Sequence, residues 1–316
     1  MRRRAGHDPP ARGDLGVSGV DPGDIEAFAA AVGTDDPVCV RGGGSHWMLG
    51  GEPAAGVREV VAPSGIAAFD PAEMTVTVGA GTTLVDLAAV LAEAGQEVAL
   101  EGPSGSTVGG VLAVGRSSLR RGRVGAARDA LLQATCVGAD GRLFSAGGPT
   151  VKNVTGYDLC RLLVGSLGTL ALLASVILRT RPVPEESCWL QGQMEPAAVA
   201  AGCHRPATLL WDGARTAVRL EGYREDVEAS AESLVAELGL EPIEGPPALP
   251  PHRSRWDGIL PEGGILEVGS GVVHGPEPLP VPVPAPGVAA LGRRIRDGFD
   301  PTGRLNPGRD PYRLVA

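Results

Sequence analysis

This sequence has few cysteines, and none is placed to share a metal ion or a cluster with another. The Cys-x-x-Cys pair that is typical of zinc sites and iron–sulfur clusters does not occur, so the sequence encodes neither. We expect isolated thiols that are buried like small apolar residues in a reducing compartment: Cys39, Cys136, Cys160, Cys188 and Cys203.

Long apolar segments and an excess of positive charge are also lacking. No stretch reaches the roughly 18 apolar residues of a membrane-spanning helix, and residues 162–178, which come nearest, are interrupted by Gly165 and Ser166. The arginines after Met1 resemble the start of a signal peptide, but no apolar segment follows them. The net charge of −9 argues against a nucleic-acid partner. We therefore expect a cytoplasmic protein.

What the sequence does have is glycine and proline in an otherwise ordinary composition. The 316 residues include 47 Gly and 28 Pro, while 43% are hydrophobic and 21% are charged. The normal hydrophobic fraction indicates a folded protein that is rich in loops, and the length allows two domains.

Two glycine-rich loops carry the strongest functional signal. Arg41-Gly42-Gly43-Gly44-Ser45 follows the apolar run at 38–40, and residues 102–110, Gly-Pro-Ser-Gly-Ser-Thr-Val-Gly-Gly, lead into another apolar segment. Consecutive glycines let successive backbone N–H groups converge on one anion. Two such loops around a strand and a helix predict a long ligand with phosphate groups, such as a dinucleotide.

Periodicity and capping residues predict the secondary structure as far as residue 178. Asp21 is expected to cap the first helix, with Pro22 as its first residue, and Thr82 or Thr83 to cap the second. The predicted helices cover 21–31, 83–95 and 158–164, and the predicted strands 37–41, 57–62, 74–79, 131–137, 143–144 and 170–178.

A break at residues 180–184, Thr-Arg-Pro-Val-Pro, predicts a domain boundary. Beyond it the sequence predicts strands at 187–192, 207–211, 216–222 and 264–269, helices at 224–238 and 288–298, and an extended run at 276–286, where every second residue is proline. The expected organisation is a flexible N-terminus at 1–20, a first domain at 21–182, a second domain at 183–298 and a C-terminal tail at 299–316.

Six motifs occur in an order that resembles the FAD-binding domain of the vanillyl-alcohol oxidase, or PCMH-type, family. They are Arg41-Gly-Gly-Gly-Ser45, Val78-Gly-Ala-Gly-Thr-Thr-Leu84, Pro103-x-x-x-Thr107-Val-Gly-Gly110, Arg128-Asp129, Val137-Gly-Ala-Asp-Gly141 and Gly165-Ser-Leu-Gly-Thr-Leu170. Lys152-Asn-Val-Thr-Gly-Tyr-Asp-Leu159 and the tail Phe299-Asp-Pro-x-Gly-Arg-Leu-Asn-Pro-Gly308 look like those of the FAD-binding subunit of bacterial glycolate oxidase.

The resemblance implies an α+β fold. Its two-part PCMH-type FAD-binding domain, made of two α/β subdomains, would be followed by a smaller, reduced α+β cap domain, and the tail would return toward the flavin. It also implies the residues that bind FAD: Arg41, Gly42, Gly43, Gly44, Ser45, His46, Pro103, Ser106, Thr107, Val108, Gly109, Gly110, Gly115, Ser117, Ser118, Gly165, Gly168, Leu170 and Asn306.

Attachment of the flavin depends on one position of the first loop. Many relatives carry a flavin-linking His where this chain has Ser45, so the resemblance implies non-covalent FAD. His46 is one residue out of register, and a polar surface position is the expectation for it. His274, in an alternating Val-Val-His-Gly segment, is expected to be structural.

Five arginines gather in a short segment of this acidic chain: Arg116, Arg120, Arg121, Arg123 and Arg128. One interpretation is a positive rim beside the flavin, suited to a 2-hydroxy-acid carboxylate or to reduced flavin; the other is a solvated loop. Arg128 is the arginine expected to be buried against an Asp. His204, His252 and His274 lack the spacing of metal ligands, so no metal site is predicted, and the sequence names no catalytic residue.

The resemblance implies an FAD-dependent oxidoreductase acting on the CH–OH group of glycolate or another small 2-hydroxy acid. The chain would work in a heteromeric complex with a catalytic flavin subunit and an iron–sulfur subunit, with hydride passing to flavin N5 or electrons relayed onward. Any membrane association would come through those partners. The alternative is a non-catalytic, FAD-bearing or empty subunit that stabilises its partners, and a third is an independent flavin oxidase.

Overall fold

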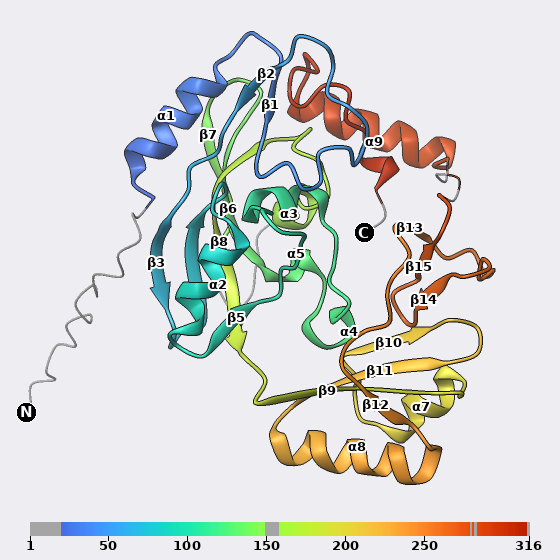
Figure 1. Ribbon diagram of the computed structural model, residues 1–316. Coiled ribbons are helices and arrows are strands. Elements are labelled where there is room, and N and C mark those ends of the chain that lie inside the picture. The colour runs from blue at the N-terminus through green and yellow to red at the C-terminus, as the bar shows by residue number, and fades with distance from the viewer. Residues whose placement is uncertain (1–19, 149–157, 279, 281–282, 315–316) are drawn as a thin grey trace, which may run out of the picture.

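The computed structural model describes residues 20–148, 158–278, 280 and 283–314, and it shows a mixed α+β chain built around two large sheets (Figure 1). The N-terminus up to residue 19 and most of the Lys152–Leu159 motif, residues 152–157, lie outside the described residues. Among the helices of the described ranges, none combines the length and the apolar composition that a membrane crossing requires.

The first large sheet is antiparallel, in the order β3-β4-β8-β6-β7, and a further strand, β5, pairs with β8. Its strands are β3 (Ile66–Asp70), β4 (Thr75–Gly79), β5 (Gln96–Val98), β6 (Leu131–Val137), β7 (Leu143–Gly147) and β8 (Leu172–Pro182). The associated helices are α2 (Leu84–Ala92), α3 (Val108–Val114), α4 (Arg121–Val124), α5 (Ala127–Ala130) and α6 (Leu159–Leu163).

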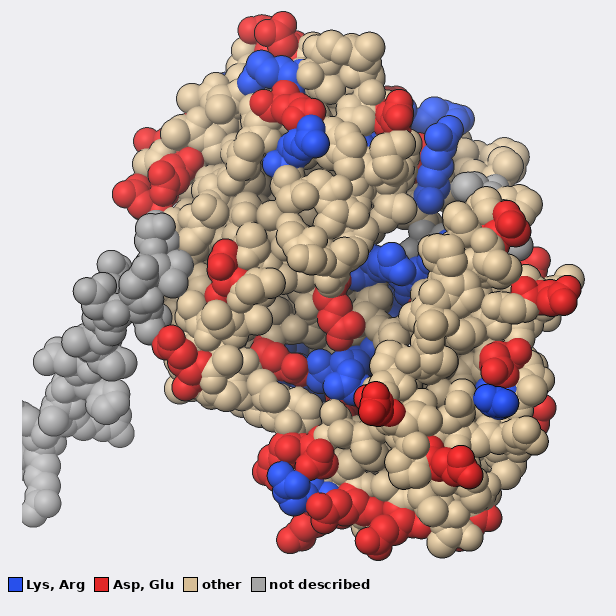
Figure 2. Space-filling model, in the orientation of Figure 1, with Lys and Arg blue, Asp and Glu red and all other residues tan. Residues whose placement is uncertain are grey.

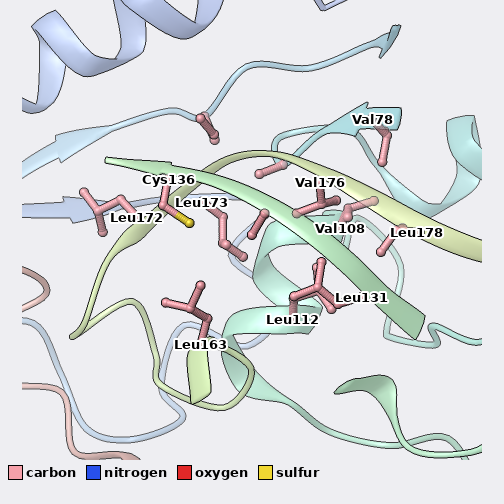
Figure 3. Packing of buried hydrophobic residues seen from close by; sticks show 14 of the residues in the cluster. Val78, Val108, Leu112, Leu131, Cys136, Leu163, Leu172, Leu173, Val176 and Leu178 are labelled. Carbon is pink, nitrogen blue, oxygen red and sulfur yellow. The ribbon is translucent and has the colours of Figure 1, made fainter. Parts of the chain in front are cut away.

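Helix α3 is held against this sheet by its apolar side chains. Val108 and Leu112 of α3 lie among Val78, Val176 and Leu178 of the strands in one buried cluster (Figure 3). Burying side chains of this size contributes roughly 1.5–3 kcal/mol each. The packing therefore fixes where the second glycine-rich loop, which enters α3, can lie.

A small parallel pair, β1 (Val38–Val40) and β2 (Arg58–Val60), lies beside α1 (Pro22–Val32). Asp21 caps α1 by accepting a hydrogen bond from the Gly23 amide. The C-terminal tail joins this pair, because Leu305 forms a parallel bridge with Val38. Buried Arg304 strengthens the junction by donating to backbone carbonyls, among them that of Val32.

The second large sheet has the order β12-β9-β11-β10-β14-β15-β13 and is antiparallel throughout. Its strands are β9 (Glu186–Gly192), β10 (Thr208–Trp211), β11 (Thr216–Gly222), β12 (Glu241–Ile243), β13 (His252–Arg255), β14 (Ile265–Glu267) and β15 (Val272–Gly275). Helices α7 (Pro196–Gly202) and α8 (Arg224–Leu238) cover one face, where Val227 and Leu234 pack on Leu190 and Val218.

The other face of the second sheet turns toward the first part of the chain. Leu210 and Ile265 pack with Leu119 there, and the Thr208 hydroxyl donates to the Leu119 carbonyl over 3.0 Å. The chain then returns through α9 (Pro286–Phe299) and a 3₁₀ turn, η1 (Pro311–Arg313), so that the red C-terminal segment lies near the blue β1–β2 pair in Figure 1.

The α+β fold class is confirmed, as are most of the elements predicted with strong patterns. Helices α1, α2, α6 and α8 and the β6–β7 hairpin form where the sequence predicted them. The strands β3, β5, β12, β13 and β15 and helix α7 were not predicted. The expected domain boundary falls at the end of β8 and its connection to β9; the division into domains stays a prediction.

Candidate functional site

The two glycine-rich loops meet around one cavity in the first part of the fold. Segments that are distant in the sequence complete it: the turn after β4, the loop before β8 and the C-terminal tail. The cavity is lined by Val40, Gly42, Gly43, Gly44, Ser45, His46, Trp47, Leu49, Ala62, Ala80, Gly81, Thr107, Gly109, Gly110, Ala113, Val114, Leu163, Ser166, Leu167, Gly168, Ala171, Leu172, Leu173, Asn306 and Arg309.

The first loop offers backbone donors to this cavity. Arg41 donates its amide to the Val60 carbonyl and Trp47 donates to Gly44, but within the described residues no acceptor lies in reach of the amides of residues 42–46. Gly44 has φ +74°, a left-handed conformation that glycine adopts without strain. Successive free amides around such a residue form a concave donor group that suits an anion.

The second loop forms a wall of the cavity, and the amides at its end, where α3 begins, are already engaged. The amides of Val108 and Gly109 donate to the carbonyls of Thr82 and Ala80, over 2.9 and 2.7 Å. That of Gly110 donates to the Thr107 hydroxyl, which caps α3. These three amides are therefore not available to a phosphate. The hydrogen bonds from Val108 and Gly109 join the loop to the β4–α2 turn.

Direct contacts hold the two loops together. The Ser45 and Ser106 hydroxyls lie 2.8 Å apart, and a Cβ added at Gly43 would collide with the Gly105 carbonyl. A Cβ at Gly42 would likewise meet the Thr107 hydroxyl. These glycines are required because the loops approach each other so closely, a reason that the sequence alone did not show.

The tail closes the cavity through Asn306 and Arg309. Asn306 donates its side-chain amide to the Gly168 carbonyl over 3.1 Å. Arg309 donates to the carbonyls of Trp47, Leu49 and Gly51 and lies 4.7 Å from the centre of the Trp47 ring. Sequence analysis missed Arg309 and Trp47. Arg309 directly follows the tail motif, and Trp47 directly follows His46. Extending each motif by one residue would have included both.

His46 lines the cavity instead of occupying the surface position expected for it. Its Nε2 is buried and has no hydrogen-bond partner in the described part of the chain, while its Nδ1 lies 3.4 Å from the Ser45 hydroxyl. Burial lowers the pKa of His46, and the positive charge of Arg116 lowers it further. A neutral imidazole with an unsatisfied buried nitrogen is suited to a hydrogen bond with a bound ligand.

The structure brings about half of the residues implied by the resemblance to the cavity. Those that line it are Gly42, Gly43, Gly44, Ser45, His46, Thr107, Gly109, Gly110, Gly168 and Asn306. The others, Arg41, Pro103, Ser106, Val108, Gly115, Ser117, Ser118, Gly165 and Leu170, lie outside its lining. Some of these support it: Arg41 lies 4.9 Å from the Trp47 ring centre, and Gly115, at φ +68°, packs closely on Gly165.

The arginine cluster divides into residues of different kinds. Arg120 is 7% exposed and binds two carboxylates, those of Glu97 and Glu221. Arg128 is exposed, so the expectation that it is buried against an Asp was wrong; Asp129 pairs instead with Arg161, over 2.9 Å. His274 is buried and hydrogen-bonded to Glu267 over 2.7 Å, as a structural histidine would be.

The chemistry of the cavity fits a dinucleotide. It presents a row of unengaged amides for a pyrophosphate, apolar side chains such as Val40 and Leu172 for flat ring systems, and an unsatisfied imidazole nitrogen. No group of three metal-ligating side chains occurs among the described residues.

Comparison with known proteins agrees with this geometry. Residues 21–147 match the model of a family described as "FAD binding domain". The match covers the part of the chain that contains both glycine-rich loops, and it identifies FAD as the cofactor.

Curated relatives extend the comparison beyond that domain. The chain is 31% identical over 230 residues to glycolate oxidase subunit GlcE of Escherichia coli, covering 67% of this chain and 64% of the relative. It is 34% identical over 148 residues to a D-lactate dehydrogenase of Archaeoglobus fulgidus, covering 46% of this chain and 33% of the relative. The chain thus spans less than two thirds of either relative.

A solved structure supports the fold of almost the whole chain. Alkyldihydroxyacetonephosphate synthase superposes with a TM-score of 0.62 at 14% identity, over 90% of this chain and 73% of that protein. At this level of identity the likeness concerns the fold alone.

Proposed function

We propose that this chain is the FAD-binding subunit of an oxidase or dehydrogenase complex for glycolate or another small 2-hydroxy acid. The observation that carries the proposal is the cavity between the two glycine-rich loops, where the amides of residues 42–46 have no acceptor among the described residues. The named relatives, an oxidase subunit for glycolate and a dehydrogenase for D-lactate, support the choice of substrate class.

The residues of this chain would bind and orient FAD. The free amides of residues 42–45 would hold the pyrophosphate, the His46 Nε2 would hydrogen-bond to the cofactor, and Arg309 would keep the first loop in place. Bound FAD would supply the hydride acceptor for the α-carbon of the acid. Ser45 lies where a flavin-linking His would stand, so the attachment would be non-covalent.

Onward electron transfer would need other chains. The five cysteines are scattered in the sequence, and the described residues contain no cluster of ligands for a metal. An iron–sulfur subunit and a catalytic flavin subunit are therefore the partners proposed, and the similarity to a glycolate oxidase subunit supports them.

A second candidate is a subunit that holds FAD, or no flavin at all, and only stabilises its partners. Two observations favour this candidate. His274 is hydrogen-bonded to Glu267, and the described residues contain no group of side chains that could bind a metal ion. If its role is accessory, this chain should oxidise little substrate by itself.

An anaerobic bleaching assay separates these functions. The FAD-loaded chain is mixed with glycolate or lactate, alone and with its partner subunits, while the flavin absorption is followed. We expect slow bleaching alone and fast bleaching in the complex. Rapid, complete bleaching of the isolated chain would contradict the accessory role, and a complex whose activity is unaffected by removing FAD from this subunit would contradict the proposed function.

A further inference from the structure

Helix α9 carries an apolar face that the fold covers only in part. Val288, Leu291, Ile295 and Phe299 recur at spacings of three and four residues, which places them on one side of the helix. Ile295 and Phe299, toward its C-terminal end, pack against the buried cluster of the first sheet. Val288 and Leu291, earlier on the same side, are 53% and 55% exposed. The apolar face therefore continues beyond the part of the fold that buries it.

Tyr312 of η1 extends this exposed surface. Its hydroxyl donates to the Val288 carbonyl over 3.0 Å, and a Cβ added at Gly292 would collide with that hydroxyl. Tyr312 therefore lies against α9 beside Val288, and it is itself exposed. Aromatic side chains are enriched at protein–protein interfaces and contribute strongly to binding there. We call the surface formed by Val288, Leu291 and Tyr312 the α9 face.

Three arginines follow the α9 face on the same helix: Arg293, Arg294 and Arg296. All three are exposed, and none forms a salt bridge with a residue that the structure describes. Arg224 of α8, by contrast, pairs with Glu186 at 2.7 Å. Positively charged side chains lie over α9 and the C-terminal turn at the upper right of Figure 2, while acidic ones are spread across most of the face shown. The surface around the α9 face is thus locally positive on an acidic chain.

These features favour an acidic protein surface as the partner. Exposed apolar side chains are buried against apolar ones, and arginines without a counter-charge attract carboxylates. Two copies of this chain that met through the same surface would bring their arginines together, and like charges repel. An anionic membrane would attract the arginines but repel a chain whose net charge is −9. A partner chain with an apolar patch bordered by Asp or Glu fits both the apolar face and the charge.

We propose that the α9 face and the three arginines that follow it dock an acidic patch of a partner subunit. The partner would bury the apolar side chains of the face and place carboxylates against the arginines. This inference deepens the proposed function and rests on it for the identity of the partner as a subunit of the same oxidase or dehydrogenase complex. None of these residues lines the FAD cavity, so docking and FAD binding can be measured separately.

Docking is tested by measuring the affinity of the whole, FAD-loaded chain for the purified catalytic flavin and iron–sulfur subunits, at low and at high salt. Leu291→Asp tests the apolar face, and Val235→Asp is its matched control, because Val235 is 42% exposed on another helix, α8. Arg293→Glu combined with Arg294→Glu tests the charge, and Arg215→Glu, at an exposed position in a turn, is its control. FAD content and circular dichroism are measured for each variant.

We expect Leu291→Asp to weaken binding of the partner at least about tenfold, because it places a charge in the apolar part of the interface. The double charge reversal should weaken binding about 10- to 100-fold. Binding by the unaltered chain should weaken as the salt concentration rises, and this dependence should be smaller in the charge-reversed variant. Both control variants should bind like the unaltered chain, and every variant should keep its FAD.

Two further measurements examine the other occupants of this surface. A dimer of the isolated chain that Leu291→Asp dissociates would overturn the proposal in favour of a second copy. Binding to vesicles of phosphatidylglycerol and phosphatidylcholine that the charge reversal abolishes would overturn it in favour of a membrane. A complex that forms equally well with Leu291→Asp, the charge-reversed variant and their controls would overturn this surface alone. An unaltered chain that binds neither subunit would overturn the proposed complex together with this inference.

Discussion

At the scale of single residues, Arg309 and Trp47 connect the two ends of the described chain. Arg309 donates to carbonyl groups up to 262 residues away in sequence and lies over the Trp47 ring, while Arg41 lies on the same ring at 4.9 Å. Arg309 is only 8% exposed, so water could hardly replace it as the hydrogen-bond donor to these carbonyl groups. One side chain therefore fixes the first loop against the tail.

Replacing Arg309 by lysine should destabilise the fold and weaken FAD binding. Lysine keeps the charge but loses the planar group that spans several carbonyls and stacks on Trp47. We expect a loss of about 2–3 kcal/mol in the free energy of unfolding, measured by urea denaturation. Arg294→Lys, at an exposed position, is the control. If both variants unfold at the same urea concentration and keep FAD equally, Arg309 does not fix the loop.

Residue-level prediction succeeded where a residue type has a local role and failed where its role is set by distant partners. Asp21 caps α1 as predicted, and Thr83, one of the two predicted candidates, caps α2, because capping depends on the next few residues. The buried arginine of the cluster could not be identified, because Arg120 finds Glu221 101 residues away. Arg128, predicted to be buried, has no such partner and is exposed.

At the scale of elements, the two glycine-rich loops have different roles that their sequences do not distinguish. The first loop keeps the amides of residues 42–46 unengaged among the described residues, while the amides of Val108 and Gly109 in the second are bound to the β4–α2 turn. Both contain glycines because they pack closely, as at Gly43 beside Gly105. The first loop therefore presents a run of consecutive free amides to a phosphate, whereas the amides at the start of α3 are engaged.

Gly43→Ala should separate the loops and lower FAD affinity. Its new Cβ would collide with the Gly105 carbonyl, a backbone atom that cannot rotate away. We expect a loss of about 1–3 kcal/mol in stability and at least a tenfold rise in the FAD dissociation constant, with little change in circular dichroism. Gly245→Ala, where an added Cβ meets nothing within 4 Å, is the control. FAD affinity that is equal in the two variants would contradict the importance of this contact.

Elements with a strong local pattern were predicted, and those that depend on pairing were not. Helix α8 forms over Arg224–Leu238 as predicted, because its length and the Gly239 that ends it are local features. Strand β5 is Gln96-Glu97-Val98, a short polar sequence that becomes a strand only by pairing with the end of β8. Strand β13 likewise depends on β15.

At the scale of the whole molecule, a buried ion cluster joins the two large sheets. Arg120, from the segment after α3, binds Glu97 of β5 and Glu221 of β11 at once. The side chain of Glu221 is 2% exposed, and Arg120 at 2.7 Å is a nearer counter-charge to it than Arg219 at 3.6 Å. The cluster therefore fixes the position of the second sheet relative to the first.

Arg120→Met should therefore destabilise the chain strongly. It would remove the guanidinium nearest to Glu97 and Glu221 and leave them only the more distant Arg181 and Arg219, at 3.8 and 3.6 Å. Loss of one partner of a buried pair is expected to cost about 3–5 kcal/mol. Urea denaturation measures the loss, and Arg128→Met, at an exposed position, is the control. Adding Glu221→Gln to Arg120→Met should recover part of the stability. Equal stability of Arg120→Met and Arg128→Met would show that the ion cluster does not join the sheets.

The function proposed for the whole molecule depends on FAD being held in the cavity by non-covalent contacts. The visible absorption spectrum of the purified chain, recorded before and after acid precipitation, reports on both points. We expect a yellow protein, or one that takes up FAD on titration, and full release of FAD into the supernatant, since Ser45 offers no flavin-linking imidazole. A colourless chain that takes up no FAD would contradict the assignment of the cavity, and flavin that stays on the precipitated chain would contradict non-covalent binding.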